Sequence, residues 1–266
     1  MLPQGVSTTG SFYLIGERKF ARVTSTCAIP DKHLDTWAAG MAAKAAVSEQ
    51  GWRSLPEPEA IKYLKTAHER DRDSKAARGT RVHEYLEALM YDTEPKGELE
   101  EQDVSYLEAA DQLFFDHEIT VLNPELLCVS ETYEYAGTMD LLCVLDKKRV
   151  LLDWKTSAKI HDSYAWQLAA YLCADYVMDA TAKTYPIEDL HIEGAGAVHL
   201  LADGYELFML ADKEKAFAEF LALHNFRMSR TRAGKDFLDY ETWSAKQVLE
   251  RKPKISSIHR AAKKVG

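Results

Sequence analysis

The sequence predicts an α/β fold, in which a central mixed β-sheet is flanked by helices and preceded by a helical elaboration. Over much of the first 118 residues, apolar side chains recur with helical spacing. The pattern then changes to short apolar runs at 126–134, 139–145 and 149–155, which are typical of strands. A helix, two more strands and a last helix follow. This alternation favours a mixed sheet with helices on both faces.

The N-terminal part is expected to be mainly helical. A strand or hairpin over 12–23, turning near Gly16, comes first. Asp31 can cap the first helix, and Pro56 and Pro58 can open the second. The four expected helices span about 31–48, 56–70, 76–91 and 101–117.

The second half is expected to hold the sheet. Asp146-Lys147-Lys148 is a polar turn between two of its strands. A nearly all-apolar helix is predicted from Ser163 to Met178, followed by strands at 195–202 and 205–210 and a helix from Asp212 to about Met228. We therefore expect one domain over 1–228, mainly helical at 24–118 and with its core at 126–228. Residues 229–266 would be a C-terminal extension with a basic tail.

Composition limits the class of protein. The chain has 266 residues, 46% of them hydrophobic, which is enough for one sizeable core. No stretch approaches the roughly 20 apolar residues that span a bilayer, so we expect no membrane partner. The first ten residues lack the pattern of a signal peptide, which favours a cytoplasmic protein. The four cysteines are Cys27, Cys128, Cys143 and Cys173; three of them lie in apolar segments, where small core residues are expected rather than a disulfide or metal site.

The charge distribution is uneven. A formal net charge of −9 argues against a nucleic-acid partner, because phosphates require positive charge. Residues 251–266, however, hold six basic residues and no acidic one, and residues 62–81 hold seven basic and three acidic residues. Each patch is either an ordinary solvated face or a local phosphate-binding surface.

The segment Val150–Lys155 carries the strongest chemical signal. Because side chains alternate along a strand, Val150, Leu152 and Trp154 would face one way, and Asp153 and Lys155 the other. A carboxylate and an ammonium at the end of an apolar strand are costly unless they are paired or used. The pattern acid-x-Lys occurs six times in the sequence, but only this copy ends such a strand.

A second carboxylate is expected beside the first. Asp140 lies 13 residues before Asp153, at the start of the preceding strand. A hairpin that turns near 146–148 would bring the two together. Converging carboxylates repel each other unless a cation lies between them, and hard oxygen ligands favour Mg²⁺ or Mn²⁺.

Three further polar residues can be interpreted either as part of a functional site or as ordinary residues of the core. His83 lies at the edge of the apolar stripe of its helix, where a histidine is commonly a boundary residue of the core. Gln167 and Tyr171 are one helical turn apart and would equally suit a hydrogen-bonded core pair.

Together these residues form a series of four motifs: Gly79-x-x-x-His83, Gly137-x-x-Asp140, Asp153-Trp154-Lys155-Thr156 and Gln167-x-x-x-Tyr171. Their order and spacing resemble the RecB-like branch of the PD-(D/E)XK nuclease superfamily. The stretch Val23-Thr24-Ser25-Thr26, with Pro30, Leu34 and Trp37, is similar to the opening of the mitochondrial genome maintenance exonuclease and related bacteriophage exonucleases. The resemblance covers residues from about 20 to 228. It implies a restriction-endonuclease-like core.

The resemblance also implies roles. The metal ligands would be His83, Asp140, Asp153 and the main-chain carbonyl of Trp154. Lys155 would orient or deprotonate the attacking water and offset charge, with Gln167 and Tyr171 supporting the site. The residues expected to contact nucleic acid are Thr24, Ser25, Arg78, Arg81 and Gln167. Glu131 would lie behind the ligands.

The function implied is a metal-dependent DNA exonuclease in recombination, repair or replication, located in the host cytoplasm if bacteriophage-encoded. Its partners would be DNA, single-stranded or with free ends, and a single-strand annealing or recombination protein. The alternatives are a structure-specific, restriction-like or Cas4-like endonuclease, a non-catalytic DNA-binding protein, and an unrelated α/β protein. No separate sequence-reading module is evident. Because no cysteine follows Cys173, the late cysteines of iron–sulfur relatives cannot be supplied, and no iron–sulfur cluster is expected.

Overall fold

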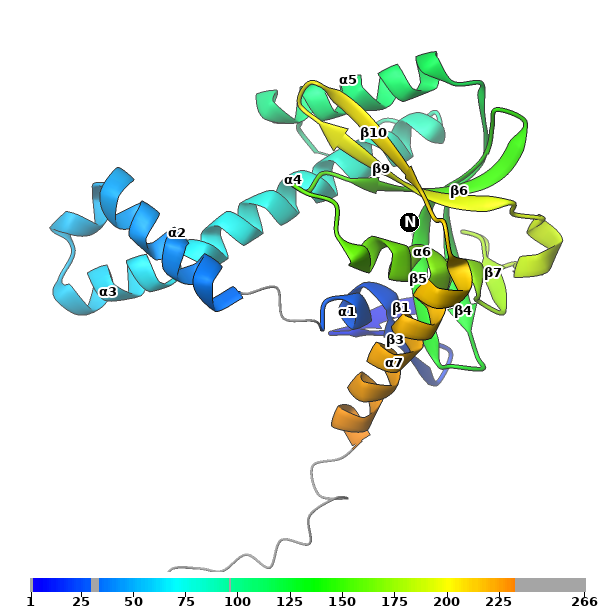
Figure 1. The fold of residues 1–266 in the computed structure, drawn as a ribbon, viewed down its shortest axis with the longest axis horizontal. Coiled ribbons are helices and arrows are strands. Elements are labelled where there is room, and N and C mark those ends of the chain that lie inside the picture. Colours follow the sequence, from blue (N-terminus) through cyan, green and yellow to red (C-terminus); the bar gives the residue numbers. More distant parts are fainter. Residues whose placement is uncertain (1, 30–33, 96, 233–266) are drawn as a thin grey trace, which may run out of the picture. The chain divides into compact units, whose positions relative to one another are not determined.

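The computed structural model describes residues 2–29, 34–95 and 97–232. The chain divides into two compact units, residues 1–225 and 226–266. The first unit contains the sheet and most of the helices (Figure 1). The described part of the second unit is the last portion of helix α7 (Lys213–Arg232). None of the described helices is long and apolar enough to cross a membrane.

The described residues form a ten-stranded mixed sheet. Its strands are β1 (Val6–Thr9), β2 (Phe12–Ile15), β3 (Arg18–Arg22), β4 (Ile119–Ser130), β5 (Tyr135–Leu145), β6 (Lys148–Lys155), β7 (Tyr176–Met178), β8 (Thr184–Pro186), β9 (Gly194–Leu201) and β10 (Gly204–Met209).

The sheet branches at β5. One path runs in the order β1-β2-β3-β5-β4-β7-β8, and a second runs from β5 through β6 and β9 to β10. Strand β4 pairs along one edge of β5, whereas β3 pairs with the beginning and β6 with the end of its other edge. Two of the pairings are parallel, β3 with β5 and β6 with β9, and the others are antiparallel. The predicted mixed sheet is therefore confirmed. Strand β6 lies inside it, with a hydrogen-bonded neighbour on each side.

The turn between β5 and β6 consists of Asp146 and Lys147, which have φ angles of 48° and 72°. Left-handed conformations at both central residues are typical of a two-residue hairpin, because their twist matches that of the strands. The Asp146 carboxylate also accepts a hydrogen bond of 3.1 Å from the main-chain N–H of Glu118. The turn fixes the register of the two strands that carry the predicted acidic residues.

The helices of the first unit are α1 (Val23–Cys27), α2 (Leu34–Ser48), α3 (Glu57–Lys65), α4 (Ala67–Met90), α5 (Glu101–Asp116), α6 (Asp162–Leu172) and the beginning of α7, with short 3₁₀ turns η1 (Gly51–Ser54) and η2 (Ile187–Leu190). The first half of α4 extends away from the sheet to α2 and α3, whereas its second half reaches α5 and β4 (Figure 1).

Buried side chains form a core on each face of the sheet. On one face, Leu151 and Ala197 pack with Val23 of α1, Leu168 of α6 and Phe220 of α7. The second core lies on the opposite face and joins the sheet to α4 and α5. It includes Val82, Leu86, Leu113, Val150, Leu152 and Trp154. The predicted alternation along β6 is thus confirmed, and it directs Asp153 and Lys155 to the side of α6.

Several predicted boundaries are wrong. The second and third predicted helices are α3, which ends at Lys65, and α4, which begins at Ala67 instead of Ala76. The helix predicted from Ser163 to Met178 ends at Leu172. There, Asp175 donates its main-chain N–H to Val129 of β4, and Tyr176–Met178 joins the sheet as β7. Strands β1 and β8 and helix α1 were not predicted. The expected cap Asp31 lies outside the described residues.

Candidate active site

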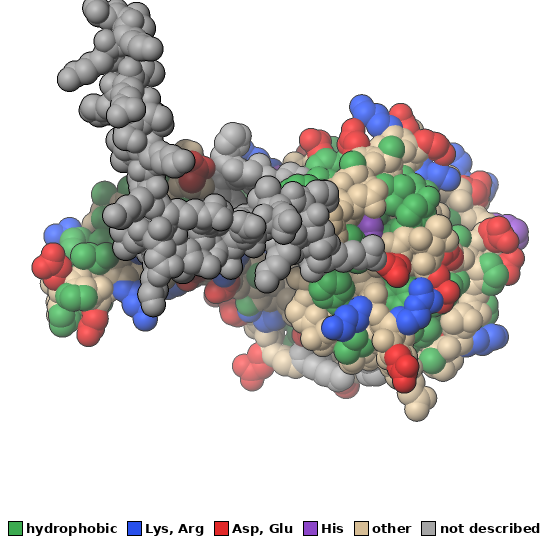
Figure 2. Space-filling view, turned by 90° about the horizontal axis from the view of Figure 1, so that it is seen from below, with side chains coloured by type: hydrophobic (Ala, Val, Ile, Leu, Met, Phe, Trp, Pro, Cys, Tyr) green, Lys and Arg blue, Asp and Glu red, His purple; other side chains and the backbone are tan. Residues whose placement is uncertain are grey.

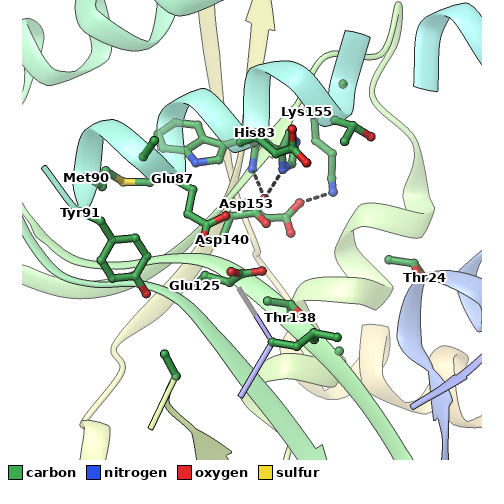
Figure 3. A pocket seen from close by; sticks show the side chains of 18 of the residues that line it. Thr24, His83, Glu87, Met90, Tyr91, Glu125, Thr138, Asp140, Asp153 and Lys155 are labelled. Atoms are coloured by element: carbon green, nitrogen blue, oxygen red, sulfur yellow. Dashed lines mark hydrogen bonds and ion pairs between the residues drawn. The ribbon is translucent and has the colours of Figure 1, made fainter. Parts of the chain in front are cut away.

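Strands β5 and β6 place Asp140 and Asp153 opposite each other. Their last register pair is Leu141 with Leu152, so the next step pairs the two acidic residues. One Asp140 oxygen accepts a hydrogen bond of 2.9 Å from the main-chain N–H of Trp154. The side chains converge in one pocket, together with His83 and Lys155 (Figure 3). The sequence-based expectation of two facing carboxylates agrees with this arrangement.

His83 and Lys155 provide the positive charges beside these acids. His83 Nδ1 lies 3.3 Å from Asp140 Oδ2, and the Lys155 ammonium forms an ion pair with Asp153 Oδ2. Asp153 is only 1% exposed, and its Oδ2 has no hydrogen bond besides this ion pair. A buried carboxylate of this kind is stable only because a cation faces it.

The two carboxyl groups differ in acidity. Burial, and then the negative charge of Asp140, raise the pKa of Asp153 to about 6. Burial also acts to raise the pKa of Asp140, but the facing His83 and the Lys155 ammonium lower it overall. The pKa of His83 is raised in turn, because the two carboxylates outweigh the effect of burial. Burial and the mutual influence of these charged groups therefore make Asp153 a weaker acid than Asp140.

Helix α6 supports the carboxylate and the ammonium from one side. Gln167 donates hydrogen bonds from Nε2 to Asp153 Oδ1 at 3.0 Å and to the Tyr171 hydroxyl at 2.7 Å, while its Oε1 accepts one of 3.0 Å from Lys155. A single amide thus fixes both charged groups of β6. Gln167 and Tyr171 form the hydrogen-bonded pair that was one of their two interpretations, and this pair lines the pocket.

Two glycines of the motifs allow close packing around the site. A Cβ atom at Gly137 would lie 2.6 Å from Tyr171 Cε1 and 3.0 Å from Val23 Cβ. A Cβ atom at Gly79 would lie 3.2 Å from the hydroxyl of Thr156, which follows Lys155. The position of the tyrosine ring therefore leaves no room for a side chain at 137, whereas at 79 the close approach of α4 to the end of β6 leaves room for one only if Thr156 shifts slightly.

The pocket has a volume of about 1020 Å³, and all four motifs contribute to its lining. Sequence reasoning missed part of the lining. Tyr13 and Arg22 reach it from the N-terminal hairpin, and Glu87 and Tyr91 extend the His83 face of α4. The spacing of four residues from His83 to Glu87 to Tyr91 is a helical signal that could have revealed the α4 residues. No comparable local signal marks Tyr13.

The lining is strongly acidic. In addition to Asp140 and Asp153 it includes four glutamates, whereas its basic side chains are His83, Arg22 and Lys155. The glutamates are Glu84, Glu87, Glu94 and Glu125. In the close-up, Glu87 and Glu125 lie beside Asp140 (Figure 3). A polyanion can enter such a pocket only if additional cations enter with it.

Only some of the residues expected to contact nucleic acid line the pocket. Thr24 and Gln167 line the pocket, but Ser25, Arg78 and Arg81 are not among its lining residues. Arg81 instead binds the fully buried Asp103 at 2.6 Å and Glu100 at 3.1 Å. The guanidinium of Arg78 lies over the ring of Tyr106, 4.9 Å from its centroid. Glu131 is exposed and forms an ion pair with Arg18.

The basic run at 62–81 is also largely neutralised within the protein. Arg70 pairs with Glu49, Arg72 with Asp73, and Lys75 with Asp71. Figure 2 likewise shows basic and acidic side chains interspersed over one face of the described part. The basic tail at 251–266, for which DNA contact was one interpretation, lies outside the described residues.

Asp140 and Asp153 offer converging carboxylate oxygens, which suit a hard divalent cation, and His83 adds an imidazole nitrogen beside Asp140. Within the part of the chain that the structure describes, no three His, Cys, Asp or Glu side chains are arranged to hold a metal ion. In this arrangement His83 Nδ1 lies beside Asp140 Oδ2, and the ammonium of Lys155 contacts Asp153 Oδ2. A metal ion bound through Asp153 Oδ2 would replace the Lys155 ammonium at that oxygen.

Comparison with known proteins gives no family assignment. No protein-family model matches the chain, and no curated protein matches it.

Proposed function

We propose that the protein is a metal-dependent DNA exonuclease with a PD-(D/E)XK site on a restriction-endonuclease-like core. It would hydrolyse phosphodiester bonds from DNA ends in recombination, repair or replication. One observation carries the proposal: two facing carboxylates and a lysine ammonium meet at the end of the central strand β6, inside a pocket. Buried charges with a shifted pKa in a cleft are typical of catalytic sites.

His83, Asp140, Asp153 and the main-chain carbonyl of Trp154 would hold Mg²⁺ or Mn²⁺. Bound there, the ion would supply Lewis acidity and activate water. The acidity of the pocket supports this requirement, because a phosphodiester would otherwise meet six carboxylates with few opposing cations.

The protein's own groups prepare the site. Lys155 places a positive charge where negative charge would develop on the phosphate, and it can hold the attacking water by a hydrogen bond. Gln167 keeps Asp153 and Lys155 in fixed orientations through its two hydrogen bonds. Tyr171 in turn fixes the amide of Gln167.

Digestion of end-labelled single- and double-stranded DNA, with and without Mg²⁺ or Mn²⁺, tests the proposal. We expect cleavage only with the metal ion, and loss of cleavage in Asp153→Asn. Asp73→Asn is the matched control, because Asp73 begins another acid-x-Lys sequence but is exposed on α4. Metal-dependent cleavage that survives in Asp153→Asn would show that the site is misassigned.

The preference for ends has a separate support. The pocket is walled by the second half of α4 and by the N-terminal hairpin, two segments from different parts of the chain. Such walls favour a strand that enters by its end. Linear single-stranded DNA should therefore be degraded much faster than a closed circle of the same sequence. Equal rates would favour the endonuclease alternative.

A further inference from the structure

The ammonium of Lys155 has a third neighbour that none of the four motifs includes. Besides Asp153 and Gln167, the ring of Tyr164 lies beside it, with Lys155 Nζ 4.8 Å from the ring centroid. The lysine side chain is only 14% exposed. A buried ammonium must find compensating groups, and the face of an aromatic ring attracts a cation through its negative quadrupole.

The ring of Tyr164 is itself held in place. Its hydroxyl donates a hydrogen bond of 2.7 Å to Ser157 Oγ, and Ser157 donates in turn to the carbonyl of Lys159 at 2.7 Å. The buried His199 donates from Nε2 to the carbonyl of Ser157 at 2.7 Å. These bonds tie the loop after Lys155 to both α6 and β9. The ring is therefore fixed by contacts that do not involve the ammonium.

These contacts matter once the partners of Lys155 change. Under the proposed function, a divalent ion held by Asp153 would compete with the ammonium for this carboxylate, whose Oδ2 the ammonium now contacts. Gln167 and Tyr164 are then the neighbours left to hold the lysine. An amide oxygen alone would let the flexible lysine chain swing, whereas the ring gives the ammonium a second contact.

We propose that Tyr164 is a positioning residue, which holds the Lys155 ammonium toward the scissile phosphate by cation–π attraction. This inference rests on the proposed function. It adds Tyr164, three residues before Gln167, to the groups on α6 that organise the end of β6. The competing explanation is packing, since Tyr164 also contacts the core on this face of the sheet.

The test varies the electrostatics of the ring while nearly keeping its shape. In the full-length protein, Tyr164→Phe keeps the ring, and the 4-fluoro, 3,5-difluoro and 3,4,5-trifluoro derivatives of that phenylalanine weaken its negative face stepwise. Cleavage of end-labelled linear single-stranded DNA is measured with Mg²⁺. We expect kcat to fall in order along the series, by about twofold to thirtyfold in total, with KM for DNA nearly constant.

The chain offers a matched control at Tyr185. Lys183 Nζ lies 4.7 Å from the centroid of that ring, which lies on β8 and does not line the pocket. The same fluorinated residues at 185 should leave kcat unchanged. A fall of equal size at both positions would overturn the inference, because it would reflect a general effect of fluorination.

Two outcomes separate this inference from the function on which it rests. If the parent protein cleaves DNA but kcat is flat along the series, Tyr164 only packs and this inference alone fails. If the parent protein cleaves no DNA, the proposed function fails and the inference with it.

The contact between Lys155 and Tyr164 can also be measured without activity. In NMR spectra, the Hε protons of Lys155 should show an upfield ring-current shift in the parent protein and in Tyr164→Phe, but not in Tyr164→Leu. Equal chemical shifts in all three proteins would overturn the inference.

Discussion

The basic run at 62–81 and the pocket both concentrate charge, but their charges are arranged in opposite ways. In the run, Arg72 and Lys75 lie at the surface beside the acids that neutralise them. In the pocket, Asp153 is buried beside a second carboxylate, and its pKa is raised. Exposed pairs contribute about 0–1 kcal/mol, whereas breaking a buried pair costs about 3–5 kcal/mol. The burial and the partners of a charged side chain therefore indicate a functional site better than the number of charged residues in a segment does.

The largest difference between the two regions should appear when a lysine is removed from each. Lys155→Ala should lower the cleavage rate by about 10²–10³-fold, because a preorganised charge is lost from the transition state. Lys75→Ala removes the lysine of a surface acid-x-Lys sequence and should leave the rate unchanged. Single-turnover cleavage of end-labelled DNA measures both.

Calorimetric titration with Mn²⁺ is the control, because it measures whether Lys155→Ala still binds the metal ion. We expect the variant to bind Mn²⁺ as the parent protein does. A rate for Lys155→Ala within about threefold of the parent would leave this lysine without a catalytic role.

Arg81 belongs to the basic run by sequence but resembles the pocket in its surroundings. Its partner Asp103 is 0% exposed and also accepts a hydrogen bond of 3.1 Å from the main-chain N–H of Glu100 at the start of α5. Asp103→Asn should lower the free energy of unfolding at pH 7 by about 3 kcal/mol. Denaturant unfolding measures the change, and a matched substitution at the exposed Asp73 should have little effect.

The pH dependence of this effect has a definite sign. Burial acts to raise the pKa of Asp103, but the hydrogen bonds from Arg81 and Glu100 lower it overall. A lowered pKa in the folded state stabilises the protein above the unfolded value of about 3.9, and this contribution is lost as pH falls through the folded pKa. The difference between parent and Asp103→Asn should therefore shrink in acid. A difference that grows in acid would contradict the assignment.

Glycine substitutions compare packing at the pocket with packing in α2. Gly137→Ala places a methyl group against Tyr171 and Val23, and it should destabilise the protein by about 1–3 kcal/mol. Gly40→Ala, in the middle of α2 and facing open space, should stabilise it by about 0.5–1 kcal/mol. Thermal unfolding of the two variants would distinguish them. Destabilisation by both would mean that the space near Gly40 is not open.

The smallest expected effect concerns DNA binding by the basic run. Because Arg72 and Lys75 are already paired, replacing both with Gln should hardly change the dependence of log affinity on log salt. Two phosphate contacts would reduce the slope by about 1.4, at about 0.7 for each on single strands. Arg22→Gln, in the pocket lining, should reduce it by about 0.7. Fluorescence anisotropy over a salt series measures these slopes. A reduction of the slope near 1.4 for the double variant would show that Arg72 and Lys75 do contact DNA phosphates.

Local sequence patterns predicted the centre of the site because its geometry is local. Alternation along β6 places Asp153 and Lys155 on one side, and a two-residue turn places Asp140 opposite. The same reasoning could not find Tyr13, because its contacts with the pocket depend on β5, a strand more than 100 residues away, which pairs with β3 and whose Thr138 hydroxyl lies 3.1 Å from that of Tyr13.

The partners of buried charged residues could not be predicted from local sequence patterns either. Arg81 reads as a free cation in a basic run, since its partner Asp103 lies on a different helix. The end of α6 was misplaced for a related reason: the apolar residues of β7 suit a helix until β4 supplies a strand to pair with.

The attachment of the N-terminal hairpin has a consequence for the order of folding. Only two residue pairs, Ala21 with Tyr135 and Arg22 with Ala136, join β3 to β5. A ribosome releases the hairpin more than 100 residues before its partner strand, so the first segment synthesised must wait for β5 before it can dock. The pocket wall that carries Tyr13 and Arg22 can therefore be completed only after the start of β5, the strand that bears Asp140, has emerged. In a nascent chain, closing of this wall thus depends on the same strand that carries Asp140.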